Sequence, residues 1–227
     1  MTNKPWITSK GMRSAFWVLV VILVLTICLC ILFYPEPYLF FKQTISSLGH
    51  ILSTSGYSNK ISQWIFTTGF GIIAVGALFM MVAYTNMRGF YGAGWKVLTL
   101  FIFFFGAIGT AFPADHPDAT YQTYHIAGAA LFVIGFGLFN FVSQLLRFIR
   151  KHTPIPKRGV RKRDFYLDMT FVILVFICVL WYVLSGLLID LLGFSDPWFG
   201  PFNTEVSQKI LLFVGCVAAF LLDLDDM

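Results

Sequence analysis

The sequence VLVVILVLTICLCI, which runs from Val18 to Ile31, decides the fold class, because Thr26 is the only residue in it with a hydroxyl group. A segment that is apolar on every side is typical of a helix surrounded by lipid, since a helix at the surface of a soluble domain has a polar face. A membrane-spanning β-strand would instead alternate apolar and polar residues over about ten positions. The stretch therefore predicts an α-helical membrane protein.

Further segments of the chain have the same apolar character. About 20 helical residues cross a hydrocarbon core, because the core is about 30 Å thick and a helix rises about 1.5 Å per residue. The segments that we expect to span the membrane are Ala15–Tyr34, Trp64–Tyr84, Trp95–Phe112, His125–Leu146, Tyr166–Leu188 and Ile210–Leu222. The sequence thus predicts an all-α fold: one polytopic domain, residues 1–227, with six transmembrane helices.

The composition agrees with this fold class. Of the 227 residues, 58% are hydrophobic and only 12% are charged, and the mean hydropathy is +0.78. These values lie outside the range of ordinary soluble domains. The basic residues cluster at the predicted membrane edges without interleaved aromatic platforms, so we expect membrane lipids and no nucleic acid as partners.

The positions of Lys and Arg predict the orientation, because short connections on the cytoplasmic side retain basic residues. Basic residues precede the first segment, flank the second connection at Arg88, and fill the fourth connection from Arg147 to Arg163. Lys42, Lys60 and Lys209 are the exceptions. Both termini are therefore expected in the cytoplasm, and the connections after the first, third and fifth segments on the opposite side.

Two of the outer connections are expected to enter the membrane interface. In the first, the spacing of Phe40, Phe41, Ile45, Leu48, Ile51 and Leu52 predicts a short amphipathic helix lying in the interface. In the third, the aromatic residues of Phe194–Phe202 favour headgroup depth. Glycines such as Gly69, Gly76, Gly128 and Gly135 predict that the second and fourth segments pack centrally, since small residues let helices approach closely.

Polar residues that can carry chemistry gather on the predicted outer side. We expect them to line a polar pocket at the extracytoplasmic boundary, with Ser46, Ser47, His50, Asp115, His116, His125 and Lys209 as ligand-binding residues. Protonated histidines and Lys209 are suited to a lipid phosphate. The first hypothesis is therefore a protein that binds a lipid or isoprenoid-like molecule and acts in lipid remodelling or homeostasis.

Two other functions remain open. The same cluster could serve a membrane-embedded hydrolase or acyl transferase, with His125, Asp115, His116 and Ser47 as catalytic candidates. A histidine and carboxylate pair could also bind a metal, but the spacing of His116 and His125 is not that of a ligand pair on one helix face, and we assign no metal ligand. A transporter of a small solute ranks third, because the spans offer mainly glycines and an isolated Asn140 at mid-depth. Asp168, about one turn inside the fifth segment, is interpreted as structural.

Three short motifs resemble those of a known family. Ile45-Ser46-Ser47-Leu48-Gly49 follows the first segment, Phe112-Pro113 ends the third, and His125 begins the fourth. In these motifs the chain resembles the prokaryotic six-span membrane family catalogued as domain of unknown function 998, and more distantly the DRAM and Sfk-type proteins tied to lipid remodelling. The resemblance implies a six-span fold in a prokaryotic plasma membrane.

The same motifs yield a geometric prediction. Pro113 disfavours a helical conformation at Phe112, so the third helix is expected to stop there and the chain to turn across the mouth of the bundle. We predict that His125 points into the bundle and hydrogen-bonds either the Ser46–Gly49 segment or the Phe112–Asp115 turn.

Overall fold

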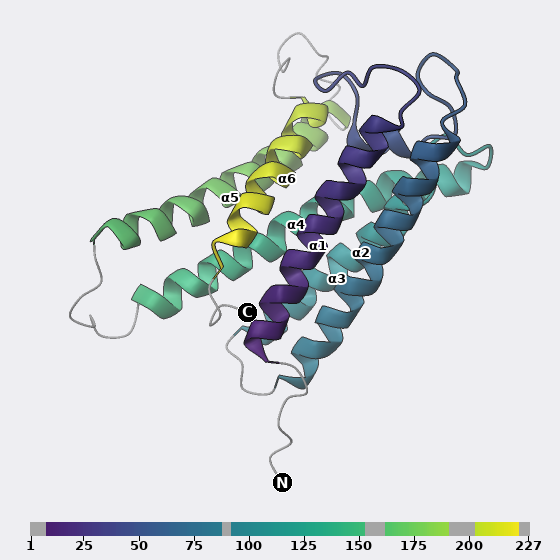
Figure 1. Cartoon of the computed structure of the whole chain (residues 1–227). Helices are drawn as coiled ribbons and strands as arrows, with labels where there is room; N and C mark the ends of the chain where they lie inside the picture. The colour runs from purple at the N-terminus through teal and green to yellow at the C-terminus, as the bar shows by residue number, and fades with distance from the viewer. Residues whose placement is uncertain (1–7, 88–91, 153–161, 191–202, 223–227) are drawn as a thin grey trace.

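The computed structural model describes residues 8–87, 92–152, 162–190 and 203–222, and within these it contains helices and no β-strand (Figure 1). The helices are α1 (Ser9–Leu32), η1 (Ile45–Gly49), α2 (Lys60–Asn86), α3 (Ala93–Thr110), α4 (Ala119–His152), α5 (Lys162–Asp190) and α6 (Thr204–Phe220). The α-helices lie where the apolar segments predict them, with ends shifted by a few residues. The prediction of an all-α protein is therefore confirmed.

Five of these helices, α1 to α5, are long and apolar enough to cross a membrane. The remaining helix, α6, has 17 residues and measures about 25 Å at roughly 1.5 Å per residue. Its last carbonyl groups accept hydrogen bonds from side chains of other helices: Trp17 Nε1 donates to Ala219 O at 2.9 Å, and Gln144 Nε2 donates to Ala218 O at 2.7 Å. Two of the terminal carbonyls of α6 thus have side-chain donors within the protein.

Two ends of the bundle can be distinguished in Figure 1. The connection 33–59 between α1 and α2 and the connection 111–118 between α3 and α4 lie together at one end, which we call the loop end. The opposite end, which we call the basic end, carries Arg147, Lys151 and His152 on the last turns of α4. Asp168 of α5 lies there too, 3.3 Å from Arg147, 2.9 Å from Lys151 and 3.0 Å from His152, in the structural role expected for it.

Helices α3 and α4 pack closely because glycines face each other across their contact. A Cβ atom added at Gly128 would lie 2.4 Å from the backbone of Gly109, and one added at Gly135 would lie 2.5 Å from the backbone of Phe103. Helix α4 also contacts α5 and α6, so its predicted central place agrees with the structure. The glycines of α2 instead receive side chains of α1, with Thr26 against Gly69 and Leu19 against Gly76.

The predicted amphipathic helix in the first outer connection is wrong in length and position. The structure has only the 3₁₀ helix η1, five residues long, in which Ile45, Ser47, Leu48 and Gly49 are buried. Its flanking residues Thr44 and His50 have extended backbones. The segment packs between the helix ends instead of lying flat on the surface, because side chains from other elements bind its backbone, as described below.

Some predictions concern residues outside the described ranges. These are the second connection at Arg88, the middle of the basic connection with Lys157, Arg158 and Arg161, and the aromatic stretch Phe194–Phe202.

Candidate functional site

Asp115 joins the two connections at the loop end. Helix α3 ends at Thr110, shortly before Phe112-Pro113, and the chain then turns toward the first connection. The Asp115 carboxylate accepts hydrogen bonds from Ile51 N at 2.7 Å and Leu52 N at 2.9 Å. A carboxylate that accepts two backbone N–H groups is a strong anchor, so Asp115 fixes the chain directly after η1.

Helix α2 holds the same segment from the other side. Asn59 Nδ2 donates to Leu48 O at 3.0 Å and to His50 O at 2.9 Å, and Ser62 Oγ donates to Leu48 O at 2.8 Å. The ring of Phe66 lies directly under Gly49, where an added Cβ would come within 2.5 Å of the ring. The role of Asn59 was not foreseen from the sequence, although an asparagine directly before a helix is typical of a residue that binds backbone groups at the helix start.

His125 has the predicted orientation. Its side chain is only 1% exposed, and its Nδ1 is hydrogen-bonded to the carbonyl of Phe112. Because a carbonyl only accepts, Nδ1 carries a proton. Nε2 is buried and has no hydrogen-bond partner among the described residues, and the ring lies 6.5 Å from that of Phe66.

The other two histidines of the loop end have different surroundings. His50 is half-buried beside Asp115; burial lowers the pKa of its ring, and the charge of Asp115 opposes that change. The ring of His50 makes no hydrogen bond with the described residues. His116 Nδ1 accepts from Asp118 N at 3.1 Å, and Asp118 accepts from Thr120 N at 2.8 Å, which lowers the pKa of the Asp118 carboxyl. His116 and Asp118 thus shape the turn that starts α4.

The two serines hold η1 together. Ser47 Oγ donates to Thr44 O at 2.8 Å, and Ser46 Oγ lies 2.8 Å from Thr44 Oγ1. Within the described residues neither hydroxyl is hydrogen-bonded to a histidine, which is the contact that activates a serine nucleophile. No group of three His, Cys, Asp or Glu side chains in the same residues is arranged to hold a metal ion.

Lys209 ties α6 to the first connection. It is only 6% exposed, and its ammonium donates to the carbonyl of Phe40 and, at 2.5 Å, to that of Gln43. The ammonium also lies 4.9 Å from the ring centre of Phe40 and 5.5 Å from that of Tyr38. Lys209 thus anchors a loop in this structure.

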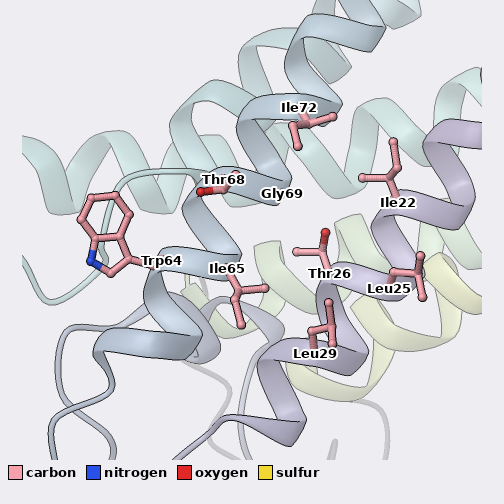
Figure 2. Close-up of a pocket in the computed structure, with 9 residues that line it drawn as sticks. All are labelled: Ile22, Leu25, Thr26, Leu29, Trp64, Ile65, Thr68, Gly69 and Ile72. Atoms are coloured by element: carbon pink, nitrogen blue, oxygen red, sulfur yellow. The ribbon is translucent and has the colours of Figure 1, made fainter.

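A groove lies on the outer surface between α1 and α2 (Figure 2). It has a volume of about 410 Å³ and is lined by Ile22, Leu25, Thr26, Leu29, Trp64, Ile65, Thr68, Gly69 and Ile72. The side chain of Thr26 packs directly against Gly69, and Figure 2 shows Trp64 at one end of the groove. The groove was not predicted, although a glycine beside small hydroxyl residues on two neighbouring apolar segments is a sequence signal for it.

Five apolar helices of membrane-spanning length, together with an apolar groove on their outer surface, fit the class of multi-pass membrane proteins. Comparisons of the chain with protein-family models, with curated proteins and with solved structures find no match.

Proposed function

We propose that this chain is a six-span membrane protein with both termini in the cytoplasm, and that it binds a lipid or isoprenoid-like molecule in its extracytoplasmic half. The observation that carries the proposal is the groove between α1 and α2. Its walls are apolar except for the hydroxyls of Thr26 and Thr68 and the indole N–H of Trp64, and it opens between two helices of membrane-spanning length. A groove in such a position meets the hydrocarbon chains of the bilayer.

The length of the groove suits a hydrocarbon segment. From Trp64 to Ile72 the groove follows α2 for about 12 Å at roughly 1.5 Å per residue. Trp64 is 63% exposed and lies in the second turn of α2, near the loop end. Tryptophan favours the depth of the lipid headgroups, which places the polar end of the ligand at the loop end.

The connection 33–59 joins α1 to α2 at the loop end, the end at which Trp64 lies. Of the residues predicted to bind the headgroup, His50 has a half-buried ring free of hydrogen bonds to the described residues and is the contact that we propose. The other predicted residues bind the loops themselves and are positioning residues: Asp115, His116, His125, Ser46, Ser47 and Lys209. We propose binding rather than catalysis because neither serine is hydrogen-bonded to a histidine in the described part of the chain.

Native mass spectrometry after mild detergent extraction tests the proposal. A retained lipid is expected on the wild-type protein and is expected to be lost in Thr68→Phe, which fills the groove. Val75→Phe is the matched control, because Val75 is 68% exposed on the same helix and does not line the groove. Equal lipid occupancy in the wild type and both variants would show adventitious lipid and refute the proposal.

A further inference from the structure

Helix α4 carries three buried polar side chains in its half nearer the basic end. Asn140 and Ser143 are fully buried and Gln144 is 1% exposed. Their spacing of three and four residues puts them on one face of the helix. Asn140 is therefore not the isolated polar residue that the sequence analysis took it to be.

Each of these side chains has an oxygen atom without a partner. Asn140 uses its amide nitrogen to donate to Phe136 O at 3.0 Å, and Gln144 uses its amide nitrogen for Ala218 O. The amide oxygens of both residues and the Ser143 hydroxyl are buried with no hydrogen-bond partner among the described residues. Unpaired buried polar atoms are costly, and natural proteins commonly satisfy them with ordered water.

The three side chains lie where α4 meets α1 and α6, because Gln144 donates to Ala218 of α6 and Phe139, one turn before Ser143 on α4, packs on α1. The rings of Phe16 on α1 and Phe139 on α4 are 4.8 Å apart. Because α1 and α4 run in opposite directions, Met12 and Arg13 lie one turn nearer the basic end on α1, at the level of Ser143 on α4. Arg13 Nε is also buried and has no hydrogen-bond partner among the described residues, while the guanidinium lies over the ring of Trp17, 4.5 Å from its centre.

We propose that Asn140, Ser143 and Gln144, with Arg13, form a binding site for ordered water, a small neutral molecule that donates and accepts hydrogen bonds. The amide oxygens need donors and Arg13 Nε needs an acceptor, and water supplies both. A cation would be repelled by Arg13 and by Arg147, one turn further along α4. An anion would face the oxygens of both amides. This site is separate from the lipid groove, because no residue of the groove belongs to it.

Radiolytic labelling in H₂¹⁸O tests the proposal, since hydroxyl radicals formed from a bound water oxidise the side chains next to it. Met12 and Met80 are both fully buried, but Met12 lies on α1 at its junction with α4 and α6, whereas Met80 lies on α2, which packs on α1 and α3. We expect ¹⁸O to be incorporated at Met12 at least several-fold faster than at Met80. Equal incorporation at both methionines would overturn the proposal.

A variant gives a second test. The double substitution Asn140→Leu with Ser143→Ala removes two of the three oxygens while retaining much of their volume. Loss of the ¹⁸O label at Met12 is expected, together with a lower melting temperature, because the remaining polar atoms then hold water less well. An unchanged label, or a higher melting temperature, would indicate a dry site and refute the proposal. If the variant does not fold, the comparison of Met12 with Met80 in the wild type decides.

Discussion

Replacing Asp115 with asparagine removes the charge from the group that joins the two connections at the loop end. The carboxylate accepts from Ile51 N and Leu52 N at 2.7 and 2.9 Å. An asparagine has one acceptor oxygen, and its amide nitrogen would point a donor at the second N–H. Hydrogen bonds to charged groups contribute about 1.5–3 kcal/mol each. Because Asp115 is half-buried, we expect the free energy of local opening of the segment after η1 to fall by about 2 kcal/mol.

Hydrogen exchange measured by mass spectrometry on peptides covering residues 48–58 reads this loss directly. A loss of about 2 kcal/mol corresponds to roughly 30-fold faster exchange of the Ile51 and Leu52 amides, since about 1.4 kcal/mol is a factor of ten. The matched control is Asp118→Asn, which alters the acceptor of Thr120 N at the start of α4. Its effect is expected near residue 120 and not at 48–58. Unchanged exchange at residues 51 and 52 in the Asp115 variant would refute the anchoring role.

Three other predictions concern packing, pH and the α6 anchor. Gly128→Ala is expected to destabilise the detergent-solubilised protein by about 1–3 kcal/mol, because the added Cβ meets the α3 backbone. The control Gly71→Ala has open space around the added Cβ and is expected to be neutral or stabilising. Unfolding in denaturant measures the stability of both variants. Because the pKa of His50 is lowered in the folded protein, the unfolded chain binds a proton first as the pH falls. Stability is therefore expected to fall as the pH drops below about 6.5, the ordinary pKa of histidine. Melting temperatures measured from pH 7.5 to pH 5 should fall less for His50→Asn than for the wild type. Lys209→Met is expected to speed proteolysis within residues 38–44, because two carbonyls there lose their donor. Equal proteolysis rates for Lys209→Met and for the exposed-site control Lys42→Met would contradict this anchoring role.

The helices were predictable because hydrophobicity over a long window reflects the environment of the whole segment. The stretch 40–52 was not, because its apolar spacing is compatible with a surface helix and its real conformation depends on distant residues. Asp115 and Ser62 bind the backbone of the segment and favour a short 3₁₀ turn over a longer helix. Partners more than ten residues away leave no trace in local periodicity.

The candidate site was predictable to the extent that it depends on chain geometry. The contact of His125 with Phe112 follows from a proline that stops α3 and a turn that must return to the start of α4. The partners of Lys209 did not follow, because they are backbone carbonyls, which every residue has. The α1–α2 groove depends on how closely the two helices approach, which the sequence expresses only through small residues such as Gly69 and Gly76.

The basic end shows how one set of charges can serve both orientation and packing. Arg147 and Lys151 predict the cytoplasmic side by their positions in the sequence, and the structure pairs both with Asp168 of α5. A buried carboxylate in an apolar helix is costly unless it is paired, and Asp168 is only 6% exposed. Because the guanidinium of Arg147 also donates to Leu221 O just after α6, the same residue connects α4 to both neighbouring helices. Neutralising Arg147 would therefore leave Asp168 with fewer partners and the end of α6 with an unpaired carbonyl, so the loss of stability should exceed that of an exposed basic residue such as Lys10.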